Sequence, residues 1–131
     1  MIAIDTNVLV RLIVNDPGSQ DQVNLAKDLL KREKAVFIPQ IVQVELVWVL
    51  ETAYGFNKPS VISGLRHLQH APVFFLEFPS LYNYALECFE NHNADFSDCL
   101  ILSGCLENKH DVVTFDKKFA RLKSVKLLEK S

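Results

Sequence analysis

Hydrophobic and polar positions follow two periodicities along this chain. Short apolar runs bounded by turn residues indicate strands, and longer segments with apolar residues every three or four positions indicate amphipathic helices. We predict strands at 1–5, 35–39, 73–78, 111–115 and 125–128, and helices at 6–15, 19–34, 40–54, 60–70, 81–91, 97–109 and 117–122. The first strand should be short and buried, and the third helix should end with Gly55 as its C-cap.

The order of these elements predicts an α/β fold. Strands alternate with helices almost throughout, and few strand pairs are joined by hairpin-length turns. Such connections are right-handed crossovers that produce a parallel sheet covered on both faces. We therefore expect a single domain over residues 1–131, a three-layer α/β/α sandwich around a mostly parallel, Rossmann-like sheet.

Acidic residues recur where this topology places ligands, beyond the carboxyl ends of the strands. Asp5 ends the first predicted strand, and Asp116 directly follows the fourth. Glu45 lies only about 8 Å along the helix after the second strand. Asp98 begins a helix that runs back along the sheet, with Asp95 three residues before it. The sequence therefore predicts that four or five acids from four segments meet at one edge.

Glu45 and Asp98 should both face inward. The helical neighbours of Glu45 include Ile41, Trp48 and Val49, which form an apolar stripe. Burying an unpaired glutamate is costly, so we expect a positive group beside Glu45. Asp98 likewise shares a stripe with apolar residues of its own helix.

Most of these acids also have an ordinary structural explanation. Asp5, Asp95 and Asp98 could each cap a helix, and Asp116 could be a turn or cap residue. Neither capping nor solvation explains Glu45. The coincidence of all five positions is stronger evidence than any one of them.

Carboxylates that cluster without histidine or thiolate are hard oxygen ligands, which suit Mg²⁺ or Mn²⁺ rather than zinc. Like-charged acids would repel one another without a cation, so the cluster predicts a metal site. Such a site lowers the pKa of a metal-bound water and stabilises an in-line displacement at phosphorus.

The overall charge of −2 does not by itself indicate a nucleic-acid binder. Residues 109–130, however, carry a local charge of +4, and the remainder carries −6. A basic end beside an acidic body could hold phosphates near a bound metal, although a solvated, helix-rich surface would look similar.

The cysteines and the apolar segments bear on location. Three cysteines without a C-x-x-C pair argue against a disulfide framework or a zinc knuckle and fit a reducing cytosol. The chain opens without a basic signal-peptide region, and its most apolar run, 41–50, contains two polar residues and is too short to cross a bilayer. We expect a cytoplasmic protein without a membrane segment.

Four motifs resemble those of the PIN-domain nucleases, and among them the VapC-type toxins of toxin–antitoxin pairs. The likeness covers essentially the whole chain in order and spacing. The motifs are Asp5-Thr6-Asn7-Val8-Leu9, Glu45 in the third helix, Asp95-Phe96-Ser97-Asp98, and Thr114-Phe115-Asp116.

The resemblance implies an α/β/α fold and a Mg²⁺- or Mn²⁺-dependent endoribonuclease that acts on transfer or ribosomal RNA. It also implies a homodimer that is silenced by a small VapB-like antitoxin, whose tail covers the acidic pocket. The implied residues are Asp5, Glu45, Asp98 and Asp116 as catalytic, metal-binding acids, Asp95 as an accessory metal-binding acid, and Thr6, Asn7 and Thr114 as residues that orient the acids.

The mechanistic hypothesis is hydrolysis of an RNA phosphodiester by a metal-bound water. Arg11, Lys117, Lys118 and Arg121 are candidates for contacts with the RNA backbone, although solvated surface explains each about as well. A haloacid-dehalogenase-type phosphatase is an alternative, but that chemistry needs a second acid at position 7, which is Asn. A catalytically silent PIN-like scaffold or interaction module is another. A receiver domain is disfavoured because no lysine ends a late strand.

Overall fold

Five short strands, all paired in parallel, form the β structure of the computed structural model, which describes residues 1–131. The chain divides into two compact units, Met1–Glu77 and Phe78–Ser131. The first unit contains β1 (Ile2–Ala3), α1 (Thr6–Ile13), η1 (Pro17–Ser19), α2 (Gln20–Glu33), β2 (Val36–Ile38), α3 (Gln40–Thr52), α4 (Lys58–His70) and β3 (Phe74–Leu76). The second contains α5 (Pro79–Asn91), α6 (Phe96–Glu107), β4 (Val112–Thr114), η2 (Phe119–Arg121) and β5 (Val125–Leu127).

The sheet of the first unit has the order β1-β2-β3. Ile2 pairs with Val36, and Val36 pairs with Phe74. The connections pass through α1 and α2, and then through α3 and α4, so parallel strands are joined by helical crossovers. This arrangement confirms the α/β class.

Strand β1 differs from its prediction because it is exposed. Ile2 is 37% exposed, whereas Ile4, just after the strand, is buried. The reason is that β1 lies at the edge of its sheet, where only one side is paired.

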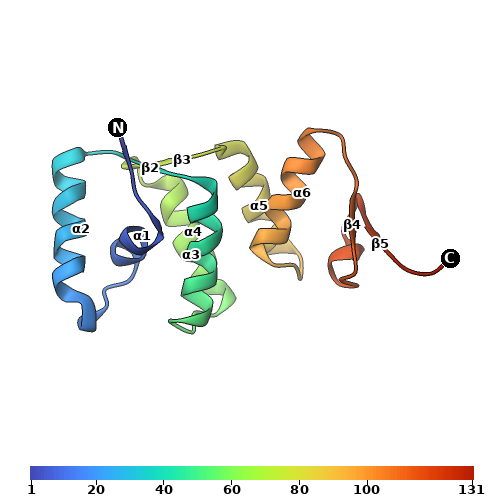
Figure 1. Cartoon of the computed structure of the whole chain (residues 1–131), viewed down its shortest axis with the longest axis horizontal. Helices are drawn as coiled ribbons and strands as arrows, with labels where there is room; N and C mark the ends of the chain where they lie inside the picture. Colours follow the sequence, from blue (N-terminus) through green and yellow to red (C-terminus); the bar gives the residue numbers. More distant parts are fainter. The chain divides into compact units, whose positions relative to one another are not determined.

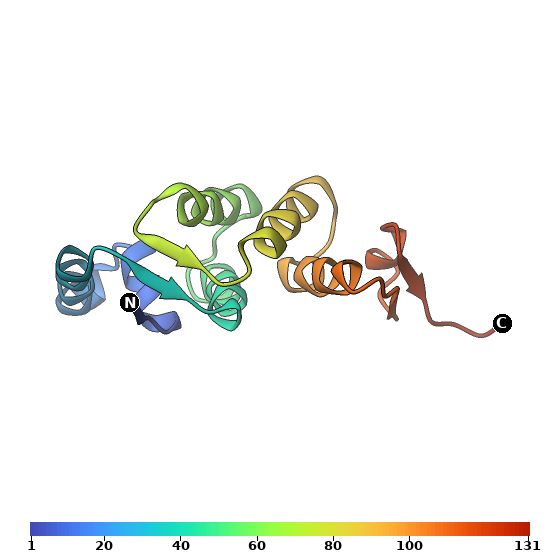
Figure 2. The same ribbon diagram turned by 90° about the horizontal axis from the view of Figure 1, so that it is seen from above.

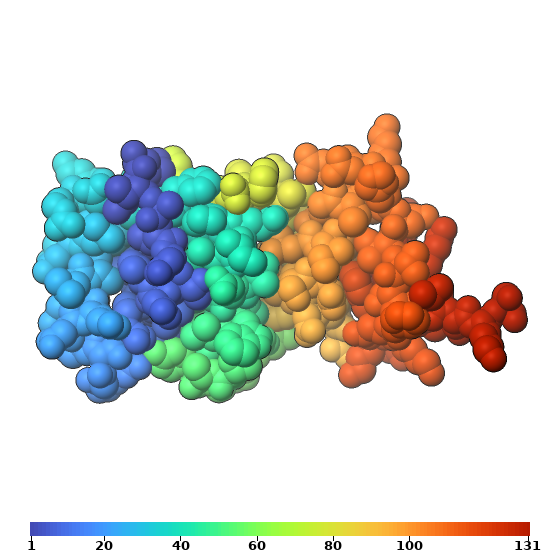
Figure 3. All heavy atoms as spheres, viewed as in Figure 1, coloured from blue at the N-terminus to red at the C-terminus, as the bar shows by residue number.

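Helix α1 lies between α2 and α3 in the first unit (Figure 1). In the space-filling view its atoms, in dark blue, fill the space between the lighter blue of α2 and the green of α3 (Figure 3). Leu9 and Val10 of α1 are buried, as are Leu46 and Leu50 of α3. These contacts set the spacing between the first turn of α1 and the middle of α3.

The ends of the crossover helices follow local capping chemistry. Asn57 caps α4, because its Oδ1 accepts a hydrogen bond of 3.0 Å from the backbone N–H of Ser60. Helix α3 ends at Thr52, and Ala53 occupies the cap position that we predicted for Gly55. Gly55 instead follows in the left-handed conformation, with φ +64°, where the chain turns toward α4.

The second unit is built on the pair α5 and α6, which pack side by side (Figure 2). Their core contains the ring of Phe96, which meets Tyr82 and Phe89 edge-on at centroid distances of 5.9 and 6.0 Å. Strands β4 and β5 pair with Val112 opposite Val125. The predicted helix at 117–122 is the short 3₁₀ turn η2.

Two expectations on cysteines and membranes can be compared with the structure. Cys88 and Cys99 are buried, Cys105 is half-buried, and all three are free thiols. None of the helices combines the length and the apolarity that crossing a bilayer requires.

Candidate active site

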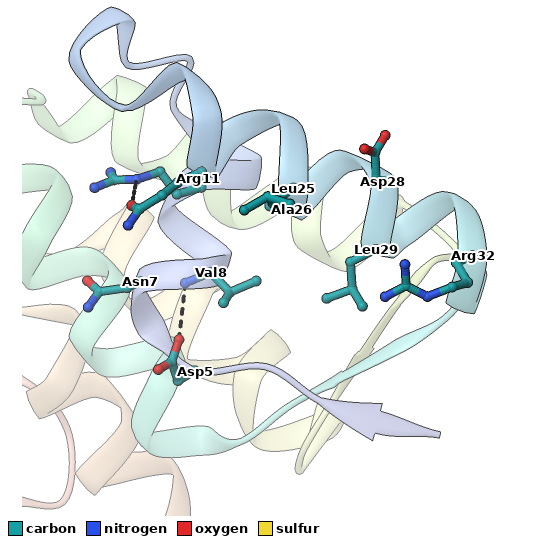
Figure 4. Close-up of a pocket in the computed structure, with 10 residues that line it drawn as sticks. Asp5, Asn7, Val8, Arg11, Leu25, Ala26, Asp28, Leu29 and Arg32 are labelled. Carbon is teal, nitrogen blue, oxygen red and sulfur yellow. Dashed lines mark hydrogen bonds between the residues drawn. The ribbon is translucent and has the colours of Figure 1, made fainter.

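Asp5 stands between β1 and α1 and is the N-cap of that helix. Its Oδ1 accepts a hydrogen bond of 3.1 Å from the backbone N–H of Val8 (Figure 4). Asp5 therefore does cap a helix, which is the ordinary structural explanation for an acid at this position. One oxygen suffices for the cap, however, so Oδ2 can take a further ligand, and a negative group is favoured at a helix N-terminus.

Glu45 is joined to α1 through Thr6. The Thr6 hydroxyl donates a hydrogen bond of 2.8 Å to Glu45 Oε1, across 39 positions of sequence. Because Thr6 directly follows Asp5, this bond ties the carboxylate of Glu45 to the first turn of α1. It is the kind of contact that an orienting residue makes.

The predicted surroundings of Glu45 are wrong in two respects. Its side chain is exposed, and its partner is a hydroxyl group rather than a cation. The buried face of α3 is formed by other residues, so the predicted inward stripe points outward: Ile41 and Trp48 are each 65% exposed. The buried residues of α3 are Val42, Gln43, Leu46, Val47 and Leu50.

In the second unit, Asp98 lies within electrostatic reach of two other acids, Asp95 and Asp116. Burial raises the pKa of Asp98 above its ordinary value, and the negative charges of Asp95 and Asp116 raise it further. Asp98 stands in the first turn of α6 and is half-buried. Asp95 occupies the N-cap position of α6, but its side chain makes no capping hydrogen bond and remains available.

Asp116 lies in the short connection between β4 and η2. Its Oδ1 accepts hydrogen bonds from the backbone N–H groups of Lys118, at 2.8 Å, and Phe119, at 3.2 Å. Its own N–H donates to the hydroxyl of Thr114, at 3.0 Å. Like Asp5, Asp116 uses one carboxylate oxygen to accept backbone hydrogen bonds, and its other oxygen can bind a ligand. The Thr114 hydroxyl fixes the backbone of Asp116 by accepting its N–H.

The donor chemistry of these residues fits a magnesium or manganese ion. Carboxylate oxygens are the ligands that both ions prefer, and the pKa of Asp98 is raised first by burial and then by the negative charges of Asp95 and Asp116. No three side chains of the His, Cys, Asp and Glu types are arranged as a ready metal site. The cluster of four or five acids therefore stays a prediction.

Asn7 is exposed at one end of a groove of about 490 Å³ between α1 and α2. Leu25 and Leu29 of α2 line this groove together with Val8 of α1, and Asp5 lies at its edge (Figure 4). The groove is thus lined by apolar side chains and has one of the candidate acids, Asp5, at its edge.

Arg11 is held by internal partners. Its Nε donates to Gln22 Oε1 at 2.9 Å, and its Nη1 donates to the hydroxyl of Tyr54 at 3.0 Å. The Tyr54 hydroxyl in turn donates to Asp16 Oδ2 at 2.9 Å. This placement favours a structural role for Arg11, and its contact with RNA stays a prediction.

The other basic candidates, Lys117, Lys118 and Arg121, are exposed side chains next to Asp116 or on η2. A negatively charged ligand bound near Asp116 would therefore lie close to the positive charges of these three side chains. Their contact with RNA also stays a prediction.

Sequence reasoning missed Glu77, an acid directly after β3. Its Oε1 accepts a hydrogen bond of 2.9 Å from the N–H of Gln40, so it caps α3 from another segment. Gln43 donates to the carbonyl oxygens of Ile38 and Glu77, at 3.2 and 3.0 Å, and thereby joins the ends of β2 and β3. The predicted strand at 73–78 placed Glu77 inside the strand, whereas β3 ends at Leu76 and Glu77 directly follows it.

The PIN domain family matches residues 2–125 of this chain. The chain is also 23% identical over 124 residues to a "VapC ribonuclease" of Aquifex aeolicus (strain VF5). The matched region covers 93% of this chain and 92% of that protein. The chain belongs to the PIN domain family. This membership confirms the α/β/α class predicted from the sequence.

Proposed function

We propose that this protein is a Mg²⁺- or Mn²⁺-dependent endoribonuclease, the toxin of a VapBC-type pair, that hydrolyses RNA phosphodiester bonds. Membership of the PIN domain family and the likeness to a VapC ribonuclease support a nuclease of this type. The observation that carries the proposal is Asp98, a half-buried acid within electrostatic reach of Asp95 and Asp116. Burial first, and then the charges of these two acids, disfavour its carboxylate form, and a bound cation would relieve this cost.

The metal ligands in this proposal are Asp5, Glu45, Asp98 and Asp116, with Asp95 as an accessory acid. When bound, the ion would supply Lewis-acid stabilisation of the charge that develops at phosphorus. Thr6 would orient Glu45, and the N–H of Val8 would hold one oxygen of Asp5 so that the other faces the ion. Thr114 would position Asp116 through its backbone, and Asn7 would act as a further polar support.

The RNA would be contacted near Asp116 by Lys117, Lys118 and Arg121, with Arg11 as a weaker candidate because its guanidinium is already paired. Looped, single-stranded segments of transfer or ribosomal RNA are the expected substrates, because specific RNA recognition generally takes place where bases are unpaired.

The groove between α1 and α2 supports the antitoxin part of the proposal. Its apolar wall would accept the hydrophobic face of a short partner segment, and Asp5 at its edge would attract a basic side chain of that segment. We further propose a single domain that works as a homodimer in the cytoplasm.

The direct test is RNA cleavage by the Asp5→Asn variant. We expect cleavage to fall by more than about 100-fold, because even residues that only support metal ligands are typically worth 10- to 100-fold. EDTA should reduce the wild-type rate to the same extent. Gel analysis of RNA incubated with each protein measures both effects, and circular dichroism checks the fold.

The matched control is Asp21→Asn, which removes an exposed carboxylate from the first turn of α2. It should cleave at the wild-type rate. Cleavage at full rate without metal would refute the proposal.

A further inference from the structure

Helix α3 presents a large aromatic side chain to solvent beside one of the proposed acids. Trp48 is 65% exposed and lies three residues after Glu45. Ile41, also 65% exposed, lies four residues before Glu45. Helical residues three and four positions apart are neighbours, so the carboxylate of Glu45 stands between two exposed apolar side chains.

The indole of Trp48 has no partner inside the chain. Its ring takes part in none of the aromatic pairs, which join Tyr54–Phe56, His67–Phe74, Tyr82–Phe96 and Phe89–Phe96. The hydrogen bond that a side chain makes to Trp48 reaches its backbone carbonyl, which accepts from the Thr52 hydroxyl at 2.7 Å. A tryptophan ring that has no hydrogen-bond or aromatic partner and is mostly exposed can offer a flat apolar surface to a ligand.

We propose that Trp48 is a stacking platform for an unpaired base of the RNA, next to the phosphodiester that is cleaved. The inference rests on the proposed function, because it takes Glu45 as part of the nuclease site. Unpaired bases stack on exposed aromatic rings, and this interaction tolerates many sequences because every base has a flat π-face. Ile41, on the other side of Glu45, offers apolar contact to a neighbouring base or sugar.

A second copy of the chain fits this face less well. A two-fold interface uses the same patch on both subunits, so pairing through Ile41 and Trp48 would bring the Glu45 side chains of the two copies toward each other. Two like charges would then lose water without gaining a partner. RNA avoids this conflict, since it leaves Glu45 free for the cation.

Fluorescence tests the stacking directly, because Trp48 is the sole tryptophan of the chain. The protein would carry Asp5→Asn, so that RNA survives, and would be titrated in Mg²⁺ with a mixed-sequence oligoribonucleotide of about ten nucleotides. We expect saturable quenching of the emission. An abasic strand of equal length and charge should not quench it, because the strand has no bases to stack.

Two outcomes of this titration would overturn the proposal. One is binding of the labelled RNA, seen by anisotropy, without any change in emission. The other is an emission shift that depends on protein concentration and not on RNA, which would assign the face to a second copy.

Cleavage kinetics in the otherwise wild-type protein supply the second readout. We expect Trp48→Ala to raise KM for single-stranded RNA about tenfold, with kcat changed less than about threefold, because the base is lost from binding and not from the chemistry. Trp48→Phe keeps a ring and should recover most of the loss. Phe75→Ala, which removes a half-exposed aromatic from β3, is the control and should leave KM unchanged.

The two hypotheses fail separately. A wild-type KM in Trp48→Ala would refute the stacking role and leave the nuclease intact. Full cleavage by Asp5→Asn would refute the proposed nuclease site itself. Equal thermal midpoints of Trp48→Phe and the wild-type protein would show that any change in KM is not caused by unfolding.

Discussion

At the scale of single residues, capping and candidate catalysis are not exclusive roles. Asp5 and Asp116 each accept backbone hydrogen bonds through one oxygen, and these bonds fix the direction of the other. A carboxylate that is held in this way loses little further conformational freedom when it binds an ion. A cap can therefore also serve as preorganisation of a metal ligand.

Asp98 should carry a cost to stability that its proposed function requires. Burial and the charges of Asp95 and Asp116 raise its pKa, which means that folding disfavours its charged form. The cost is absent at pH values well below the ordinary 3.8 and fully present above the raised pKa. Asp98→Asn should therefore raise the thermal midpoint of the metal-free protein at pH 7, and the difference should vanish in acid.

Calorimetry or circular dichroism in EDTA measures this effect, and Asp28→Asn, at an exposed position of α2, is the control. The same Asp98→Asn variant should lose cleavage. A lower midpoint at pH 7 would contradict the electrostatic explanation.

At the scale of elements, α1 is joined at two places to α3 or to the segment that directly follows α3. Thr6 and Glu45 form one connection, near the candidate acids. The other is the chain of hydrogen bonds from Arg11 through the Tyr54 hydroxyl to Asp16. Two connections along a helix pair restrict sliding as well as rotation, so the second one helps to keep Glu45 at the first turn of α1.

The second connection should make stability depend on pH. The hydrogen bond from Tyr54 lowers the pKa of Asp16 most, followed by the N–H of Gly18; burial opposes them, and the charge of Arg11 adds the weakest lowering effect. A lowered pKa stabilises the fold above the ordinary value of 3.8, and this contribution is lost as the pH falls through the lowered pKa.

We therefore expect Asp16→Asn to lower the thermal midpoint at pH 7 and to flatten its decline between about pH 4 and pH 2. Thermal scans across this range measure both effects. Tyr54→Phe, which keeps the ring and removes the hydroxyl, should show an intermediate slope. Parallel curves for the wild type and Asp16→Asn would contradict the assignment.

At the scale of the whole molecule, the proposed partner gives a test in cells. The chain expressed alone should arrest growth, and co-expression with the adjacent small partner should relieve the arrest. Asp5→Asn should abolish the arrest, because the toxicity would come from cleavage. Mapping of RNA ends in arrested cells would then identify the target.

A substitution in the groove between α1 and α2 tests whether the antitoxin can be prevented from binding while the toxin stays active. Leu25 is 69% exposed on the groove wall, so Leu25→Asp should fold and cleave RNA normally while placing a charge where the partner docks. Arrest that persists despite the partner is the expected result. Full protection of Leu25→Asp by the partner would place the antitoxin elsewhere.

The elements and the sites of the candidate acids could be predicted from the sequence because both depend on local patterns. Strand and helix periodicities placed every main helix and strand to within a few residues. Asp5 and Asp116 were recognisable because each directly follows an apolar strand. Glu77 could not be recognised in this way, because the predicted strand continued to residue 78, whereas β3 ends at Leu76.

The direction in which α3 faces was decided only by tertiary structure. Apolar residues occur on nearly all sides of this helix, so its periodicity does not identify a buried face, and the stripe through Ile41 and Trp48 was assigned inward. Packing against α1 instead buries Leu46 and Leu50 and leaves Glu45 exposed to meet Thr6. By itself the sequence determined which segments form helices and strands and where the acids stand in them. The tertiary structure decided which side chains reach one another, because that depends on contacts between residues far apart in the chain.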